Sequence, residues 1–383
     1  MTAAQDFIPF NKPFIIGKEL EYIAQAVALG QLSANGSFTK QCQAYFSGRY
    51  KIKNLLTTSC TDALELAAML LNIQPGDEVI APSFSYVSTV NPFVLRGAKI
   101  IFADSSVQHP NMDADKVESL ISSRTKAIVC VHYAGMACDM EKLLAIAKKH
   151  GIPIIEDAAH AIESKWNGEV QLGTIGQLGA FSFHETKNII AGEGGLLCIN
   201  DESFFKRAEV LVEKGTSRRS FFRGEINKYE WTDIGSSFLP SELTAAYLFA
   251  QLEEAEKIQE SRIASWNLYH KLLEPVEKAG FIARPSVPEY AMSNGHIYYV
   301  VCNAADERTK LVQALSEAGI QAVFHYQSLH KSPYYAPLYQ GEDLVNADRF
   351  STCLLRLPVF YGISGEQVNR VCATVRKHFG LPE

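Results

Sequence analysis

The sequence has no excess of basic residues, because 36 lysines and arginines are set against 42 aspartates and glutamates, giving a formal net charge of -6. A nucleic-acid scaffold needs a basic surface to neutralise phosphates, so this balance argues against that class. No apolar segment reaches the roughly 18 to 20 residues of a membrane helix. The opening residues, MTAAQDFIPFNKPF, lack the basic and apolar regions of a signal peptide. We therefore expect a cytoplasmic protein with no membrane span.

Clustered cysteines are also lacking. The eight cysteines form no CxxC pair and no group with histidine at the spacing of metal ligands. This scatter indicates reduced thiols and predicts no metal site. The chain has neither an internal repeat nor a low-complexity tract, and 47% of its residues are hydrophobic. Its 383 residues suffice for one large core and a smaller domain.

Short β-branched runs alternate with helical patterns between about residues 50 and 200. The strand-like runs are NLLTTS, EVIAPSF, AKIIFAD, KAIVCVHY, PIIEDAAH, GAFSFH and GLLCIN. Such alternation predicts an α/β domain built from βα units around a mostly parallel, buried sheet. Ligands collect at the carboxyl ends of strands in sheets of this kind.

Residues 214–242 interrupt this rhythm with polar, aromatic and glycine residues that show no clean period. A long irregular segment of this kind is typical of a functional loop or an inter-subunit arm. A helical pattern resumes near Leu243 and is followed by a smaller α+β unit, with strand candidates at 297–302 and 322–326. We expect a large domain over residues 1–250 and a small C-terminal domain over residues 251–383.

Lys187 stands between the run GAFSFH and a cluster of three glycines. A buried amine costs free energy there unless it reacts or pairs with another group. Asp157 ends the run PIIED 30 positions earlier, with one predicted strand in between, so both residues are expected at one sheet edge. Taken alone, Glu156 or Asp157 is more often a strand end that meets solvent.

The run TTSCTDALELAA turns from a strand into a helix through Ser59, Thr61 and Asp62. Such residues are commonly N-caps, but a helix N-terminus that follows a parallel strand also suits a phosphate. Tyr86 lies in a hydroxyl-rich turn, where an aromatic residue is either core or a stacking surface for a flat cofactor.

Together these parts meet the requirements of pyridoxal phosphate. Lys187 would form a Schiff base with its aldehyde, and Asp157 would keep its ring nitrogen protonated. The helix N-terminus would hold its phosphate, and the glycines after Lys187 would allow the backbone to approach without a clash. The ordered set, more than any single element, indicates this cofactor.

The ordered motifs SCTDAL, PSFSYVST, EDAAH, FSFHETKN and GEGG resemble those of the DegT/DnrJ/EryC1/StrS sugar aminotransferases. The resemblance runs from IPFNKPF to LRLPVFYGIS, nearly the whole chain, and it implies the fold of type I aminotransferases that depend on pyridoxal phosphate. Longer runs such as IQPGDEVI, VLRGAKI, VHYAG, EKGT and DIGSS resemble the branch that makes dTDP-4-amino-4,6-dideoxygalactose.

The resemblance implies a role for each matching residue. Lys187 is the catalytic lysine, and the other expected cofactor-binding residues are Thr61, Asp62, Tyr86, Asp157, His160 and Ser182. His160 stands where the family usually has glutamine. Ser237 stands where most members have an asparagine that reaches the cofactor of a second subunit, so a homodimer with shared active sites is expected; closed dimers are also the commonest oligomers.

The implied reaction moves an amino group from L-glutamate to C4 of a dTDP-4-keto-6-deoxyhexose, for synthesis of a surface polysaccharide such as O-antigen or lipopolysaccharide. Substrate contacts are expected from Arg218, Arg223, His325, Tyr326 and His330, although each could equally be a solvated surface group. The product is expected to be the 4-amino-4,6-dideoxygalactose sugar. The 4-amino-4,6-dideoxyglucose epimer and a 3-keto sugar substrate remain open.

Three other classes fit less well. Related sugar dehydratases have histidine in place of the lysine, which Lys187 argues against. A non-catalytic sensor of sugar nucleotides would not need both Lys187 and Asp157. An acyl- or phosphate-transfer enzyme using His184 and Glu185 would lack the expected P-loop or nucleophile elbow.

Overall fold

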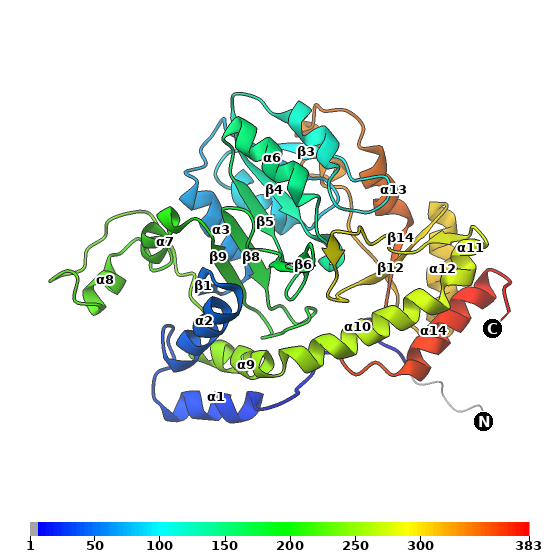
Figure 1. The fold of residues 1–383 in the computed structure, drawn as a ribbon, viewed down its shortest axis with the longest axis horizontal. Helices are drawn as coiled ribbons and strands as arrows, with labels where there is room; N and C mark the ends of the chain where they lie inside the picture. Colours follow the sequence, from blue (N-terminus) through cyan, green and yellow to red (C-terminus); the bar gives the residue numbers. More distant parts are fainter. Residues whose placement is uncertain (1–6, 383) are drawn as a thin grey trace.

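A seven-stranded sheet forms the centre of the larger unit in the computed structural model, which describes residues 7–382 (Figure 1). In spatial order the strands are β1 (Lys53–Thr57), β9 (Gly195–Ile199), β8 (Leu178–Ser182), β5 (Ile154–Asp157), β4 (Thr125–Val131), β2 (Glu78–Pro82) and β3 (Lys99–Ala103). Strands β8, β5, β4, β2 and β3 are parallel, whereas β9 is antiparallel to both of its neighbours. The predicted mostly parallel sheet is therefore confirmed.

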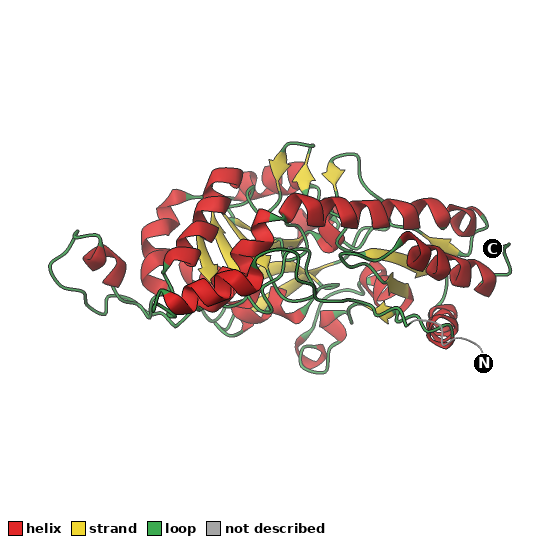
Figure 2. Cartoon of the chain, turned by 90° about the horizontal axis from the view of Figure 1, so that it is seen from below, coloured by secondary structure: helices red, strands yellow, loops and turns green. Residues whose placement is uncertain are grey.

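Helices cover both faces of this sheet, as Figure 2 shows. One face packs against α3 (Cys60–Leu70), α4 (Asn91–Val94) and α7 (Phe205–Leu211). The other face packs against α2 (Ser37–Tyr50), α5 (Ala114–Val117), α6 (Met140–His150) and α9 (Glu242–Glu253), with α1 (Glu19–Ala28) beyond α9. Because both faces are buried, the strands are apolar runs without polar alternation.

The smaller unit contains an antiparallel sheet of four strands, within the described part of the chain. Its strands are β10 (Ile282–Ala283), β12 (Tyr298–Cys302), β14 (Leu354–Leu357) and β13 (Val323–Phe324). Its helices are α10 (Ala255–Leu272), α11 (Glu274–Lys278), α12 (Ala305–Glu317), α13 (Val345–Cys353) and α14 (Gly365–His378). The sequence pattern predicts the strands β12 and β13 but gives no signal for β14.

Two features join the units. A small sheet combines β11 (Ala291–Met292) with β6 (Lys165–Trp166) and β7 (Val170–Gln171) of the larger unit. Ile8, near the start of the chain, forms a bridge with Ile320 and so packs into the C-terminal core. The domain boundary after residue 250 stays a prediction, and it falls inside α9.

Residues 214–242 form an arm that projects around the short helix α8 (Arg218–Phe222) (Figure 1). It returns to the core at Phe238, before α9 begins at Glu242. Two of its aromatic side chains are strongly exposed, Trp231 by 81% and Phe222 by 70%. The eight cysteines are free thiols and all are buried. Across residues 7–382, no helix has both the length and the apolar character needed to cross a membrane.

Candidate active site

A cavity of about 800 Å³ lies where the carboxyl ends of the parallel strands meet the smaller unit. Its lining comes from the end of β5, the end of β8 and the N-terminus of α3, and from β13 and β14 on the other side. Eight of the expected site residues line it: Thr61, Tyr86, Asp157, His160, Ser182, Lys187, His325 and Tyr326. A site at this sheet edge is where parallel sheets generally bind their ligands.

Lys187 follows β8 in a turn in which its backbone N–H donates to the carbonyl of His184 at 2.9 Å. Among residues 7–382, no side chain forms a hydrogen bond or an ion pair with its amine. Burial lowers the pKa of the Lys187 amine to about 8, and the charge of Arg356 acts in the same direction, while Cys60 and Asp157 oppose it. A larger share of this amine is therefore neutral at neutral pH than in an exposed lysine.

Asp157 ends β5 with its carboxylate buried and held by two donors. The Thr89 hydroxyl donates to Oδ2 at 2.6 Å, and the backbone N–H of Ala159 donates to Oδ1 at 3.1 Å. Burial raises the pKa of the Asp157 carboxyl, while these two donors and the charge of Lys187 lower it. A cationic ring nitrogen beside this carboxylate would favour its ionised form further. Sequence reasoning missed Thr89.

The N-terminus of α3 offers unused backbone donors to the cavity. Ser59 caps the helix by accepting from the backbone N–H of Asp62 at 3.1 Å. In the described part of the chain, the N–H groups of Cys60 and Thr61 have no hydrogen-bond partner. They are thus free to bind a phosphate oxygen, as donors at helix N-termini commonly do. The N–H of Asp62 is already used by the cap, so a phosphate contact from Asp62 stays a prediction.

Gly195 allows β9 to lie directly against this helix N-terminus. A Cβ atom at Gly195 would lie 2.3 Å from the carbonyl carbon of Ser59 and 2.5 Å from the nitrogen of Cys60. No side chain fits at those distances, which explains why a glycine follows Lys187 here. The expected close backbone approach is confirmed at Gly195, whereas Gly194 has ordinary contacts of 3.4 Å or more.

Aromatic side chains from both units line the cavity, with Tyr86 and His160 in the larger unit and Tyr326 in the smaller one. Tyr86 is 58% exposed, and its ring centroid lies 5.9 Å from that of Tyr326. His160 accepts from the backbone N–H of Ala134 at Nδ1 (3.3 Å), and its Nε2 lies 3.3 Å from the Tyr326 hydroxyl. Burial lowers the pKa of His160 well below its usual value, so this ring is neutral. Neutral His160 fits a hydrogen-bonding role next to a cofactor.

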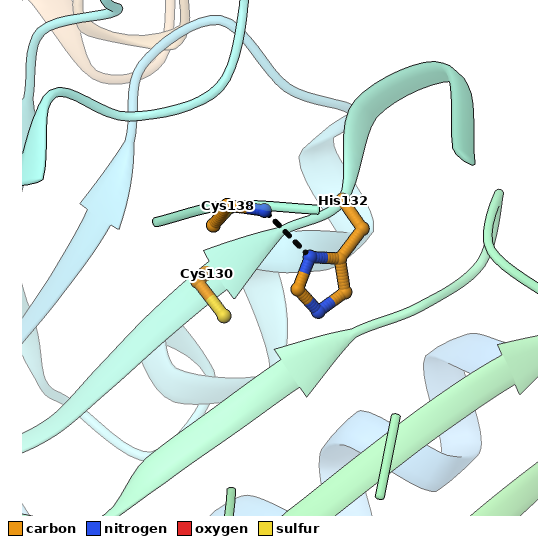
Figure 3. A group of neighbouring side chains, drawn as sticks. All are labelled: Cys130, His132 and Cys138. Atoms are coloured by element: carbon orange, nitrogen blue, oxygen red, sulfur yellow. Dashed lines mark hydrogen bonds between the residues drawn. The ribbon is translucent and has the colours of Figure 1, made fainter. Parts of the chain in front are cut away.

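Cys130, His132 and Cys138 form a buried cluster whose potential ligand atoms lie within 4.8 Å of one another (Figure 3). The backbone N–H of Cys138 donates to His132 Nδ1 at 3.1 Å, and Nε2 of the same ring bonds to Glu156 at 2.9 Å. Both ring nitrogens are therefore occupied, so a metal ion would have to displace an existing hydrogen bond. The Glu156 carboxylate also accepts three backbone N–H groups, those of Gly173, Ile175 and Gly176. We interpret the cluster as structural support for the end of β5.

Several expected site residues lie elsewhere in this chain. Arg218 and Arg223 are on the projecting arm, at the start of α8 (Figure 1) and directly after it. Arg223 pairs with Glu209 at 2.7 Å. Ser237 is also on the arm and exposed, outside the cavity lining of its own chain. His330 is buried, with Nδ1 2.7 Å from the Ser83 hydroxyl, and does not line the cavity. Their roles toward the substrate remain predictions.

Arg356 is a cavity residue that sequence reasoning missed. It lies in the middle of β14, the strand that was not identified. The sequence feature that could have identified Arg356 is its place as a single arginine within the apolar run LLRLPVF. A cation is unusual at such a position unless it has a function.

Fold and site together define an aminotransferase of fold type I that depends on pyridoxal phosphate. The free amine of Lys187, the buried carboxylate of Asp157 and the open donors of α3 fit the aldehyde, ring nitrogen and phosphate of this cofactor. The chain matches the DegT/DnrJ/EryC1/StrS aminotransferase family over residues 13–376, and it belongs to that family.

Similarity to individual known proteins supports this membership. The chain is 32% identical to the spore coat polysaccharide biosynthesis protein SpsC of Bacillus subtilis (strain 168), covering 97% of this chain and 96% of the relative. It is 30% identical to GDP-perosamine synthase of Escherichia coli O157:H7, covering 97% and 99%. Spr1654 of Streptococcus pneumoniae, described as a sugar aminotransferase and solved in its PLP form, superposes with a TM-score of 0.88 at 27% identity, covering 97% and 98%. The protein is therefore a sugar aminotransferase that uses pyridoxal phosphate.

Proposed function

We propose that the enzyme transfers the amino group of L-glutamate to C4 of a dTDP-4-keto-6-deoxyhexose and produces dTDP-4-amino-4,6-dideoxygalactose for a surface polysaccharide. The observation that carries this proposal is the cavity that Lys187 and Asp157 share with aromatic side chains of both units. The dTDP group and the galactose configuration rest on the longer sequence runs that resemble that branch of the family.

Lys187 is the residue that acts on protons in this proposal. Bound pyridoxal phosphate supplies an electron sink next to the reacting carbon. The Lys187 amine would hold the cofactor, and once released it would accept the proton from Cα of glutamate as a general base. The same amine would then give the proton back as a general acid. A pKa of about 8 allows Lys187 both to accept and to give a proton near neutral pH.

A second hollow of about 570 Å³ next to the cavity provides room for the nucleotide. The two spaces share Ser85, Tyr86, Phe324, His325 and Tyr326. Exposed aromatic surface there, including Tyr86 at 58% and Tyr334 at 68%, suits stacking with a flat base. In this proposal His325 and Tyr326 contact the sugar between the two spaces, while His330 supports their segment from behind.

A homodimer completes the site in this proposal. The arm at residues 214–242 reaches the second subunit, so that Ser237 contacts the partner's cofactor phosphate and Arg218 and Arg223 approach the partner's nucleotide. Two strongly exposed aromatic residues, Trp231 and Phe222, support an arm that docks on another surface. We place the enzyme in the cytoplasm, consistent with the free thiols of all eight cysteines.

The test is a product assay with purified protein, pyridoxal phosphate, L-glutamate and dTDP-4-keto-6-deoxyglucose. Proton couplings around C4 of the product, read by NMR, give its configuration. A small coupling between H3 and H4 is expected, because the galactose configuration makes the C4 amine axial. A large coupling would assign the 4-amino-4,6-dideoxyglucose product instead.

Because one relative is named GDP-perosamine synthase, the same assay should include a GDP-linked 4-keto-6-deoxyhexose. A 3-keto sugar nucleotide serves as a further comparison. Faster turnover of either one than of the dTDP-4-keto sugar would contradict the proposed substrate but not the aminotransferase activity.

A further inference from the structure

Arg356 lines the cavity from β14, an inner strand of the four-stranded sheet. Its strand neighbours are Tyr299 on β12 and Val323 on β13, so its backbone is fixed on both sides. One guanidinium nitrogen, Nη2, donates to the carbonyl of Phe324 at 3.3 Å. The guanidinium carbon lies 4.5 Å from the ring centroid of Phe10, a geometry typical of a cation over an aromatic face.

No carboxylate neutralises this charge within residues 7–382. The acidic residues that line the cavity are Asp157 and Glu193. Asp157 is already bonded to Thr89 and Ala159, and Glu193 lies 3.7 Å from His184. The Nε atom of Arg356 is buried and has no hydrogen-bond partner. A buried, unpaired donor costs free energy, which a ligand with an anionic acceptor would recover.

The position of Arg356 decides which anion it suits. Arg356 lines the inner cavity together with Lys187, and its charge lowers the pKa of the Lys187 amine. It does not line the adjoining hollow proposed for the nucleotide. An anion at Arg356 therefore belongs to a small molecule that reacts at Lys187, and the planar guanidinium fork matches a carboxylate well.

We infer that Arg356 is the binding site for a carboxylate of the amino donor, held through its unpaired Nε and an Nη nitrogen. This inference rests on the proposed function only in taking L-glutamate as the donor. Arg356 orients the donor so that the donor amine faces Lys187. When the keto sugar takes the place of the donor, the donor carboxylate leaves Arg356. Arg356 is thus a substrate-binding residue for one of the two half-reactions.

Calorimetric titration tests this inference without turnover. The probe is glutarate, a five-carbon dicarboxylate that lacks the reacting amine, added to the protein loaded with pyridoxal phosphate. Glutarate affinity should fall about tenfold or more in Arg356→Gln, because a charge-assisted pair of hydrogen bonds is lost. Affinity for dTDP should change by less than about threefold, because the nucleotide binds in the neighbouring hollow.

Arg349→Gln is the matched control, since this exposed arginine on α13 removes the same charge outside the cavity. It should leave both affinities at the wild-type values. Arg356→Lys keeps the charge without the fork, so its glutarate affinity should lie between those of the wild type and Arg356→Gln. Comparing the unfolding temperatures of all variants separates loss of the fold from loss of binding.

A loss of dTDP affinity with unchanged glutarate affinity would overturn the inference, and so would unchanged affinity for both ligands. The outcome is distinguishable from failure of the proposed function. If glutarate responds as expected but no amine appears on the dTDP sugar, the donor site stands and the acceptor assignment fails.

Discussion

At the scale of single residues, the Lys187 amine should control how the cofactor attaches. Only the neutral amine attacks an aldehyde, and burial lowers the pKa of this amine to about 8. The rate of covalent attachment to cofactor-free protein should therefore rise as pH increases through about 8. An exposed lysine would show this rise near its ordinary pKa of about 10.4. The measurement is the growth of the visible absorption band after mixing, across a pH series.

Lys187→Ala protein is the control for this experiment and should form no such band at any pH. If the attachment rate of the unaltered protein instead reached half its maximum close to pH 10, the Lys187 amine would not be buried as it is in the structure.

Thr89 positions the Asp157 carboxylate, because its hydroxyl donates to Oδ2 at 2.6 Å. Thr89→Val preserves the shape of the side chain but removes this donor. Loss of a hydrogen bond to a charged group costs about 1.5–3 kcal/mol, so pyridoxal phosphate should bind roughly tenfold or more weakly. Equilibrium dialysis of the cofactor measures the change. Thr352→Val, the same substitution on the exposed surface of α13, should have no effect, and equal affinity in both variants would refute the role of Thr89.

The residues that sequence reasoning identified and those it missed differ in how far apart their partners lie. Lys187 and Asp157 each follow a predicted strand, so the alternation of strands and helices was enough to bring them to one sheet edge. Thr89 contacts Asp157 across 68 positions, and no local pattern indicates that contact. Arg356 was missed with its strand, because four residues interrupted by a charge give no period.

At the scale of elements, the contact between β9 and the N-terminus of α3 shapes the phosphate site. Gly195→Ala would force a Cβ atom against the backbone of Ser59, where the nearest atoms lie at 2.3 Å. Backbone atoms cannot move aside as a flexible side chain can, so the free energy of unfolding should fall by about 1–3 kcal/mol. Cofactor affinity should fall as well, since the N–H groups of Cys60 and Thr61 would shift. Chemical denaturation and cofactor titration measure the two effects.

Gly194→Ala tests whether the position matters or merely the loss of a glycine. Its added Cβ would meet Phe183 and Ala191 at 3.4 Å or more, which is ordinary contact. Gly194→Ala should therefore retain stability and cofactor affinity. Equal damage in both variants would point to flexibility of the whole glycine segment as the cause.

The same scale shows where prediction of the fold reached its limit. All seven strands of the large sheet matched apolar runs in the sequence, because burial on both faces leaves continuous hydrophobic stretches. Strands β6, β7, β10 and β11 have two residues each and carry no pattern of their own. Only the pairing of β11 with β6 joins the two units, whereas β7 and β10 pair inside their own units. Strands of two residues are too short for a hydrophobic period, so the local sequence does not indicate them.

At the scale of the whole molecule, the exposed aromatic residues of the arm at residues 214–242 lead us to expect that a second chain covers it. Within one chain Trp231 remains 81% exposed, although its indole N–H donates to the carbonyl of Asp233 at 2.6 Å. Large exposed aromatic residues are typical anchors of protein interfaces. We therefore expect light scattering to give twice the chain mass of 42.4 kDa for the unaltered protein.

Trp231→Asp should weaken this dimer, because it removes an aromatic anchor and buries a charge at the interface. If Ser237 completes the partner's phosphate site, cofactor affinity and transamination should fall together with the dimer as the protein is diluted. Val345→Asp is the control, since Val345 is 68% exposed at the start of α13, away from the arm, and should leave the dimer intact. A fully active monomer would contradict shared active sites, because the phosphate site would then be complete within one chain.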